Sequence, residues 1–476
     1  MLRQLFIVLI LLVFAGTIYG QAADKLMGVW MGKIEAGPQS FRFVFHFKDS
    51  NGTLACTIDS PDQGATNLPT KGVSFINGNV RVDASNLGAT YTGIMQPGDS
   101  LIEGSWAQDG TSFALDLVRQ AEAVKPHRPQ TPAAPFPYTT AVVKIENGAA
   151  GAVLSGTLTI PKVGGPFPAV LLITGMGPQN RDDEVAGHKP YWVVADYLAR
   201  NGIASLRFDD RGVGQSSGKF STAVTSDFVS DAEAAFKVLL SNPRINKRKV
   251  GILGRDEGAV VGAMVAAAEP RVAFLVLLAG LGQTGEQALL TQARMVSLAS
   301  GMPESAIREM EALNKEFYRI VRETPDNGEA ISKLMEKAWA VANSQESLTS
   351  DQRKQLVNDI SSSFSMLVSP WYRGFLLLNP AVYFSKVKVP VLAINGSHDL
   401  IISADENLAA IENSLKEGGN TNFRVLKMED LNHLFQRSTR GLPSEYGTIE
   451  ETISPDVLRI VKDWIKNDVA PLPVKK

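Results

Sequence analysis

The pentapeptide Gly254-Arg-Asp-Glu-Gly258 is the part of the chain whose residue types and spacing point most directly to chemistry. It lies between a strand-like stretch, Lys249–Leu253, and a run of small residues, Gly258–Ala268. A glycine two places on either side of a central residue allows a strand to turn sharply into a helix and to present that residue at the apex. The helix N-terminus then favours negative charge there. The spacing predicts that Asp256 stands at a nucleophile position.

Two later segments supply partners for Asp256. Val389–Asn395 is predicted to be a strand, and Asp399 follows in the turn after it. His433 falls in a loop after the last predicted strand. The chain order of nucleophile, acid and histidine is that of α/β-hydrolases, so we expect Asp399 to orient His433 and to stabilise its charged form. His398 is the competing histidine, and its place beside the acid favours a role in the loop.

A strand that runs into a glycine turn, Leu172-Ile-Thr-Gly-Met-Gly-Pro178, adds a fourth component. Backbone N–H groups in such a turn are able to stabilise an oxyanion beside the nucleophile. We predict that the N–H groups of Met176 and Glu257 are the two donors. An ordinary strand-to-helix turn is the alternative for this segment, and the elbow and His433 elsewhere in the chain favour the functional interpretation.

From about residue 139 strands alternate with helices, which indicates a mostly parallel sheet with helices on both faces. Between about residues 283 and 370 strand signals vanish and residues typical of helices dominate. Because this segment falls between two strands of one sheet, we expect a helical cap over the end of the sheet, in preference to a bundle packed elsewhere. The predicted strands are 169–174, 203–208, 249–253, 273–279, 389–395 and 423–428, and the predicted helices are 188–201, 228–240 and 258–268.

The chain before residue 139 has a different organisation. Residues 1–20 combine Arg3, an apolar run and small residues near a cut site, which predicts a secretory signal peptide and an exported protein, periplasmic or secreted. Residues 24–119 hold short alternating runs between turn residues, typical of a small all-β domain. The repeated prolines of residues 120–138 predict a stiff linker. Residues 139–470 would then form the hydrolase domain.

Composition limits the possible partners and cofactors. The formal net charge is −2 over 476 residues, which argues against nucleic acid or an anionic membrane as the main partner and favours a small-molecule substrate. After signal cleavage we expect no stable membrane anchor. Cys56 is the only cysteine, and a small core residue is its expected role. His46 is expected to be structural. No residue cluster has convincing metal-ligand spacing, and we expect no cofactor.

Several segments together resemble a known family. The chain is similar to exported bacterial α/β-hydrolases of the esterase and serine-aminopeptidase-like group, some of which carry an N-terminal β domain. The resemblance implies an α/β-hydrolase fold, an activity of carboxylic-ester-hydrolase type, and the triad positions given above. The segments that carry it are Gly175-Met-Gly-Pro-Gln-Asn-Arg-Asp182, Arg207-Phe-Asp-Asp-Arg-Gly-Val-Gly-Gln-Ser-Ser-Gly218, Ser369-Pro-Trp-Tyr-Arg-Gly-Phe375 and Leu431-Asn-His-Leu-Phe-Gln436.

The elbow departs from the pattern of that family, which typically reads Gly-His-Ser-Glu-Gly-Gly. This chain has Arg255, Asp256 and Ala259 at three of the six places, which favours natural divergence over a single serine knockout. A carboxylate is ionised at pH 7 without activation. It is nevertheless a poor nucleophile toward a carboxylic ester, because expelling an alkoxide from an anhydride-like intermediate runs uphill.

Three hypotheses about function therefore stand side by side. The resemblance favours an exported hydrolase of carboxylic-ester-hydrolase type. A hydrolase with an aspartate nucleophile, of the haloalkane or epoxide type, is the first alternative, and in it His433 would activate water to cleave an alkyl-enzyme ester. Glu257 stands where haloalkane dehalogenases usually have tryptophan, and Tyr318, Tyr372 and Tyr383 are the available acids for an epoxide. A catalytically disabled binding protein is the second alternative.

Two charged segments have a structural and a functional interpretation. Arg207, Asp209, Asp210 and Arg211 are expected to brace loops near the elbow, in preference to forming a charged site wall. The run Arg181-Asp-Asp-Glu184 fits a substrate contact and a solvated loop equally well.

Overall fold

The computed structural model describes residues 25–36, 39–50, 53–63, 65–108, 111–120 and 127–469. The chain separates into two compact units, residues 1–127 and 128–476. The predicted signal peptide, residues 1–20, and part of the predicted linker lie outside the described residues. Among the helices described, none combines the length and apolarity that crossing a membrane requires.

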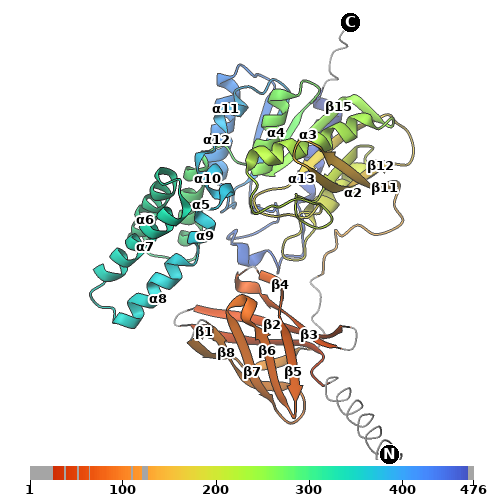
Figure 1. The fold of residues 1–476 in the computed structure, drawn as a ribbon. Helices are drawn as coiled ribbons and strands as arrows, with labels where there is room; N and C mark the ends of the chain where they lie inside the picture. Colours follow the sequence, from red (N-terminus) through yellow and green to blue (C-terminus); the bar gives the residue numbers. More distant parts are fainter. Residues whose placement is uncertain are drawn as a thin grey trace, which may run out of the picture. The chain divides into compact units, whose positions relative to one another are not determined.

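The first unit is built on a ten-stranded antiparallel sheet (Figure 1). Its strand order is β4-β3-β2-β1-β10-β8-β7-β6-β5, and β9 pairs with β8. The strands are β1 (Gly28–Ala36), β2 (Gln39–Ser50), β3 (Thr53–Ser60), β4 (Ala65–Pro69), β5 (Gly72–Ile76), β6 (Asn79–Ala84), β7 (Ala89–Met95), β8 (Leu101–Gln108), β9 (Thr111–Ala114) and β10 (Leu117–Gln120), with short helices η1 (Pro61–Gln63) and η2 (Ser85–Leu87).

The side chains of β2 alternate as the sequence predicts for a strand with one buried face. Phe43, Phe45 and Phe47 enter the core together with Trp30 and Tyr91, because successive side chains of a strand point to opposite faces. On the other face, the side chain of His46 contacts Asp59 at 2.7 Å. Cys56 is buried, and burial raises the pKa of its thiol to about 12, which fits the expected role as a core residue and makes it unreactive at neutral pH.

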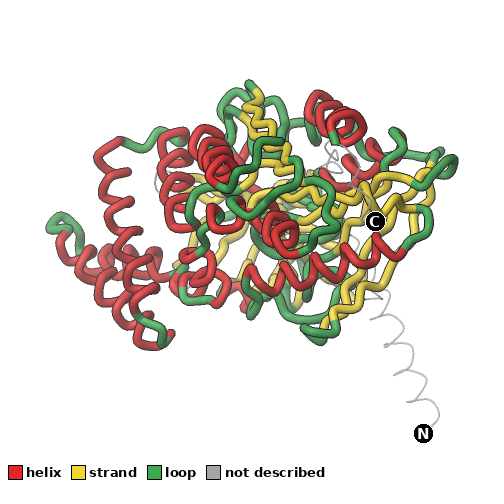
Figure 2. Tube along the Cα trace, turned by 90° about the horizontal axis from the view of Figure 1, so that it is seen from above, coloured by secondary structure: helices red, strands yellow, loops and turns green. Residues whose placement is uncertain are grey.

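The second unit is a mixed sheet covered by helices on both faces (Figure 2). Its strand order is β11-β12-β14-β13-β15-β16-β17-β18, and every neighbouring pair from β14 onward is parallel. These strands are β11 (Tyr138–Asn147), β12 (Ala152–Pro161), β13 (Phe167–Ile173), β14 (Ala204–Phe208), β15 (Ile245–Asp256), β16 (Leu275–Gly280), β17 (Val391–Gly396) and β18 (Phe423–Met428).

The apolar core of this unit forms two layers, one on each face of the sheet, and helices complete both. Helices α3, α4 and α12 contribute to one cluster of buried side chains, and α2 and α13 contribute to the cluster on the opposite face. Their apolar faces follow from residues repeated at helical spacing. The bounds are α2 (Pro190–Arg200), α3 (Thr225–Ser241), α4 (Glu257–Ala268), α11 (Ala381–Phe384), α12 (Ala404–Glu417), η3 (Pro443–Glu445), α13 (Pro455–Asp463) and the π-helical turn η4 (Trp464–Asp468).

The helical insertion between β16 and β17 has a core of its own. Buried side chains of α6 to α10 form a separate cluster that includes Phe317, Leu334 and Phe364. Figure 1 shows these helices beside the sheet, with α10 nearest to it and α6 to α8 reaching away. The insertion comprises α5 (Gly285–Ala299), α6 (Glu304–Glu323), α7 (Asn327–Ser344), α8 (Ser350–Ser361), α9 (Phe364–Leu367) and α10 (Pro370–Leu377).

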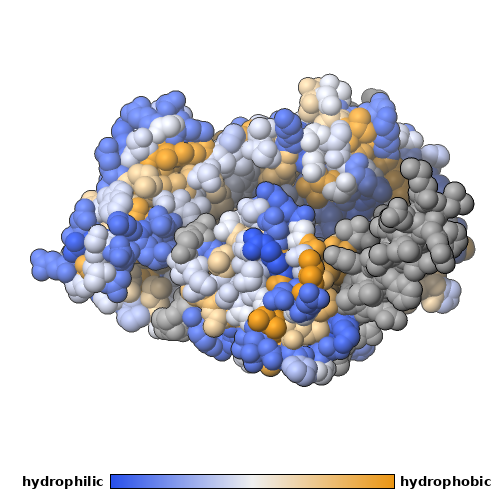
Figure 3. Space-filling model, turned by 60° about the horizontal axis from the view of Figure 1, so that its bottom comes forward, coloured by the Kyte–Doolittle hydropathy of each residue, from blue (hydrophilic) through white to orange (hydrophobic). Residues whose placement is uncertain are grey.

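Exposed hydrophobic side chains are scattered over the described surface. Figure 3 shows one face, on which hydrophobic residues form separate patches among polar ones. On the second unit, Leu377 and Val382 near the base of the insertion are exposed. Scattered exposure of this kind is ordinary for globular proteins and defines no site by itself.

The turn from β15 into α4 forces its central residue into an unusual backbone conformation. Asp256 has φ 48° and ψ −119°, a region that costs free energy for a residue with a side chain. A Cβ atom at Gly254 would lie 2.2 Å from the carbonyl oxygen of Gly258, and a Cβ atom at Gly258 would lie 2.2 Å from that of Thr174. Backbone therefore packs against backbone on both sides of Asp256, and only glycine fits at positions 254 and 258.

This packing predicts a large difference between two glycine-to-alanine substitutions in the same unit. Gly254→Ala places a methyl group into fixed backbone and is expected to lower the free energy of unfolding by about 3 kcal/mol. Gly148 has nothing within 4 Å of its Cβ position, so Gly148→Ala is the matched control, with an expected change below about 0.5 kcal/mol. Urea unfolding monitored by tryptophan fluorescence measures both. Equal stability of the two variants would contradict this account of the turn.

Candidate active site

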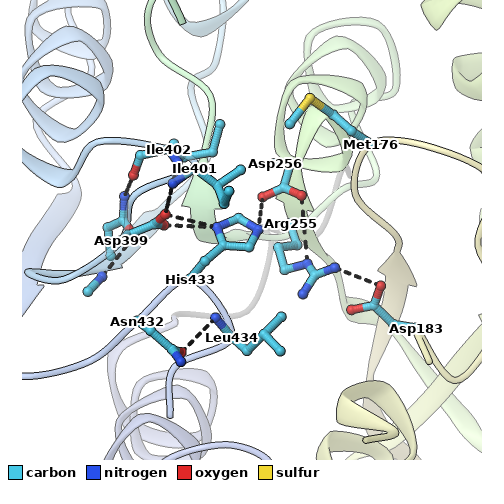
Figure 4. Close-up of polar contacts among 12 residues, drawn as sticks. Met176, Asp183, Arg255, Asp256, Asp399, Ile401, Ile402, Asn432, His433 and Leu434 are labelled. Atoms are coloured by element: carbon cyan, nitrogen blue, oxygen red, sulfur yellow. Dashed lines mark hydrogen bonds and ion pairs between the residues drawn. The ribbon is translucent and has the colours of Figure 1, made fainter. Parts of the chain in front are cut away.

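Three side chains that lie far apart in the sequence meet beside this turn (Figure 4). The Nε2 atom of His433 lies 3.1 Å from Oδ1 of Asp256. Its Nδ1 atom lies 2.9 Å from Oδ2 of Asp399. All three side chains are buried, so the imidazole ring is held between two carboxylates. The structure thus brings together the three residues predicted as nucleophile, base and acid.

Local backbone geometry fixes the acid and the base. Oδ1 of Asp399 accepts hydrogen bonds from the N–H groups of Ile401 at 2.8 Å and Ile402 at 2.9 Å. The loop that carries His433 is closed by the side-chain oxygen of Asn432, which accepts from the backbone N–H of Leu434 at 3.0 Å. These bonds leave the carboxylate and the imidazole few orientations other than the one in which they meet.

The competing histidine does not join the site. Nδ1 of His398 lies 2.6 Å from the backbone oxygen of Ser438. This contact agrees with the predicted loop role of His398, and it leaves His433 as the histidine beside the elbow.

The electrostatics of the triad favour a charged imidazole. Burial lowers the pKa of His433, but the charges of Asp256 and Asp399 outweigh burial and raise the pKa to about 10. Burial raises the pKa of Asp256, and the neighbouring charges of His433 and Arg255 outweigh it, so that the pKa falls below the usual value. At pH 7 the site therefore holds an ionised Asp256 against a protonated His433.

A second buried ion pair lies on the other side of Asp256. Nη2 of Arg255 lies 2.9 Å from Oδ1 of Asp183, and its Nε lies 3.8 Å from Oδ2 of Asp256. Burial acts to lower the pKa of Arg255, but Asp183 and Asp256 raise it overall. The sequence singled out Arg255 only as a departure from the family pattern. Asp183 was assigned to a solvated or substrate-contacting loop, and it is fully buried.

The glycine turn after β13 touches the carboxylate directly. The backbone of Met176 contributes to the lowered pKa of Asp256. A Cβ atom at Gly175 would lie 2.2 Å from Oδ2 of Asp256. An aspartate side chain reaches one atom further than serine, and here that extra atom occupies the turn. The turn that carries the predicted oxyanion donor Met176 is therefore occupied by the residue at the elbow itself.

The side chain of Glu257 has a role that the sequence did not reveal. Its Oε1 accepts a hydrogen bond from Thr225 at 2.6 Å, and its Oε2 accepts one from Trp371 at 2.9 Å. Burial raises the pKa of Glu257. Because Thr225 begins α3 and Trp371 lies in α10, the carboxylate fastens the last helix of the insertion beside the elbow. The sequence predicted only that the backbone N–H of Glu257 faces the site.

The charged segment after β14 braces the surrounding loops. Arg207 pairs with Asp182 at 2.9 Å, Arg211 pairs with Asp231 at 2.7 Å, and Asp209 pairs with Arg181 at 2.6 Å. These contacts agree with the predicted bracing role of the segment. They also give the run that begins at Arg181 a structural role, in place of a purely solvated one.

A small cavity adjoins the elbow on the side of Glu257. Its volume is about 20 Å³, which is enough for a water molecule and too small for a substrate. Asp210 borders it and accepts a hydrogen bond from Thr174 at 2.9 Å. Burial raises the pKa of Asp210 to about 7. The cavity therefore places water-sized space and a titratable carboxylate next to the turn.

The tyrosines predicted as acids for an epoxide hydrolase pack in or against the cores of the second unit. The hydroxyl of Tyr372 donates to that of Tyr318 at 3.3 Å, and both rings belong to the core of the insertion. Tyr383 packs against the cores of the sheet. No observed contact connects these hydroxyl groups with the elbow, so nothing in the geometry favours acid catalysis by them.

The sheet order, the strained turn after β15, and the acid and histidine after β17 and β18 define an α/β-hydrolase. Comparison with known families agrees. The X-Pro dipeptidyl-peptidase (S15 family) matches over residues 150–433, which is more than half of the chain, and the chain belongs to this family. The segments matched include the elbow, the acid turn and His433.

Individual relatives include proteins named as esterases. Esterase EstD of Thermotoga maritima is 24% identical over 313 residues, which cover 64% of this chain and 65% of that protein. Esterase FrsA of Escherichia fergusonii is 30% identical over 158 residues, 33% of this chain and 36% of that protein. The chain thus spans less than two thirds of the length of these relatives. The structure of the Pyrococcus furiosus esterase PF2001 aligns with a TM-score of 0.43 at 16% identity, over 74% of this chain and 100% of that chain.

The charge on His433 gives the stability of the protein a defined dependence on pH. The pKa of His433 rises from 6.5 to about 10 on folding, so the folded state binds the proton more tightly. The resulting stabilisation is complete below pH 6.5 and is lost as the pH rises through 10. Relative to His433→Gln, we expect the free energy of unfolding of the native protein to fall across this window by up to about 1.4 kcal/mol per pH unit.

Urea unfolding at a series of pH values tests this expectation. Asp256→Asn removes one of the two carboxylates and is the matched control, in which the pKa of His433 should fall and the slope should move to lower pH. If native protein and His433→Gln show the same slope, the imidazole is neutral in the folded state and the electrostatic account is wrong.

Proposed function

We propose that this chain is a hydrolase in which the carboxylate of Asp256 is the nucleophile and attacks an alkyl carbon that bears an anionic leaving group. The observation that carries the proposal is the position of an ionised Asp256 at the apex of the strained turn, between His433 and the glycine turn at Gly175. The leaving group is a carboxylate, sulfate, phosphate or halide. A carboxylic ester would then be cleaved between the oxygen and the alkyl carbon.

Because Asp256 occupies the glycine turn, attack on the alkyl carbon is favoured over attack on the acyl carbon. Acyl transfer requires the substrate carbonyl oxygen to become an oxyanion between free N–H donors. In this chain Oδ2 of Asp256 already lies against Gly175, in the turn that would receive the substrate oxygen. Attack on an alkyl carbon needs no oxyanion on the substrate, and it leaves one oxygen of Asp256 in the turn while the other reacts.

The reaction then has two steps. In the first, an Asp256 oxygen forms a bond to the alkyl carbon and the carbon–leaving group bond breaks, with its electron pair on the departing anion. Once Asp256 is esterified, His433 releases its imidazolium proton to the solvent. In the second, His433 takes a proton from water, the hydroxide attacks Cγ of Asp256, and the alcohol departs with a proton as the Asp256 carboxylate and the His433 imidazolium are restored.

The first step converts His433 from an acid into a base. While Asp256 is ionised, the two carboxylates keep His433 protonated. An ester at Asp256 carries no charge, so His433 loses one of its two anionic neighbours and its pKa falls. Asp399 remains to orient the ring at 2.9 Å. A base therefore becomes available only after the covalent intermediate has formed.

A disabled hydrolase that binds without turnover is the second candidate, and the same buried contacts motivate it. A protonated His433 that lies 3.1 Å and 2.9 Å from two carboxylates forms a buried ion network, and such a network requires no substrate. Export remains a separate proposal, which rests on residues 1–20 alone.

The covalent route predicts that solvent oxygen enters the protein. The purified protein is incubated in water enriched in oxygen-18 with 1-haloalkanes, alkyl sulfates and short alkyl esters, and the peptide that contains Asp256 is then analysed by mass spectrometry. We expect incorporation of oxygen-18 at Asp256, because water attacks Cγ of the alkyl-enzyme ester. His433→Gln should accumulate the alkyl adduct at Asp256 without the label, because no base activates water.

The outcomes separate the candidates. Oxygen-18 in the acid product of an ester, with none in Asp256, would mean acyl–oxygen cleavage and would contradict the proposal. Absence of both adduct and label, together with hydrolysis of p-nitrophenyl esters gained only by Asp256→Ser, would identify a disabled esterase.

A further inference from the structure

Arg255 is a buried cation whose hydrogen-bonding capacity is only partly used. Its Nη2 contacts Asp183, but its Nε and Nη1 have no hydrogen-bond partner among the described residues. A buried donor without a partner costs free energy and calls for an explanation. The Nε atom lies 3.8 Å from Oδ2 of Asp256. The guanidinium is therefore turned toward the carboxylate at the elbow without a full hydrogen bond to it.

The two oxygens of Asp256 have different surroundings. Oδ1 faces Nε2 of His433 at 3.1 Å. Oδ2 faces the Gly175 turn and Nε of Arg255. When Oδ1 carries the alkyl group, Oδ2 becomes the carbonyl oxygen of the ester. Attack of water on Cγ then places a full negative charge on Oδ2, beside Arg255 (Figure 4).

We propose that Arg255 is a catalytic residue that stabilises the oxyanion formed on Oδ2 of Asp256 when water cleaves the covalent intermediate. The inference rests on the proposed function, since it assigns a residue to the second of its two steps. A fixed cation aimed at the atom where charge develops accelerates a reaction because it needs no reorganisation. As the oxyanion forms, the free Nε–H gains the hydrogen-bond partner that it lacks in the resting site.

Asp183 keeps the cation in place and ionised. It is fully buried, and its Oδ1 is 2.9 Å from Nη2 of Arg255, which anchors that nitrogen and leaves Nε toward Asp256. The charges of Asp183 and Asp256 keep the pKa of Arg255 above its usual value. Asp183 is accordingly a positioning residue, and Arg255 is the one that faces the reacting atom.

The test separates formation of the alkyl-enzyme from its breakdown. The alkyl substrate that labels Asp256 in His433→Gln is mixed with each variant, and rapid-quench mass spectrometry of the intact protein follows the adduct over time. We expect Arg255→Met to slow breakdown by about 100-fold and to change formation by less than tenfold, so that the adduct accumulates. Arg255→Lys retains the charge and should recover part of the breakdown rate.

A double variant guards against simple misfolding. Arg255→Met alone leaves Asp183 buried without a cation, which destabilises the fold. Arg255→Met with Asp183→Asn removes both charges together and should show the same accumulation of adduct. A purely structural role would slow formation and breakdown alike.

Each outcome has one meaning. Accumulation of adduct in the arginine variants, with partial recovery in Arg255→Lys, supports the inference. An adduct in His433→Gln but none in the arginine variants overturns the role of Arg255 and leaves the proposed function intact, as does equal slowing of both steps. If His433→Gln forms no adduct either, the proposed function fails and the role of Arg255 fails with it.

Discussion

The buried imidazolium of His433 between Asp256 and Asp399 is the interaction on which the rest of the site depends. Two carboxylates taken out of water are costly unless a cation lies within ion-pair distance, and His433 supplies that cation at 3.1 Å and 2.9 Å. The requirement extends to the backbone, because the ring reaches both acids only if three loops at one end of the sheet are held still. Much of the surrounding hydrogen bonding serves that purpose.

An aspartate in place of serine adds a buried negative charge to the elbow, and several features offset it. The N-terminus of α4 begins directly after Asp256 and favours an anion. His433 is protonated, and Arg255 lies on the other side with Asp183 as its partner. The presence of an arginine where the family has histidine is therefore physically connected with the change at the next position. A serine elbow with Arg255 would instead leave the cation with Asp183 as its only neighbouring acid.

The backbone-determined part of the site was predictable from the sequence, and the part made by side chains across loops was not. Gly254 and Gly258 predict the turn because no other residue fits at these positions. The apolar runs before Asp399 and His433 predict the strands that precede them. The pair Arg255–Asp183 joins residues 72 apart and the pair Glu257–Trp371 joins residues 114 apart. Nothing in local spacing records which charged loop residue turns inward, so the sequence leaves Asp183 between a substrate contact and a solvated loop and predicts a backbone donor at Glu257.

The same fold is able to support different reactions, and in this protein the length of the side chain at position 256 makes the difference. In an elbow with serine, the glycine turn stays free and the substrate carbonyl oxygen enters it. In this chain Oδ2 of Asp256 fills the space above Gly175. Under the proposed mechanism, negative charge then develops on the enzyme's own carboxyl group, next to the fixed cation. In that case the family that the sheet and loops define does not by itself determine which bond of a substrate breaks, and the carboxylate at position 256 does.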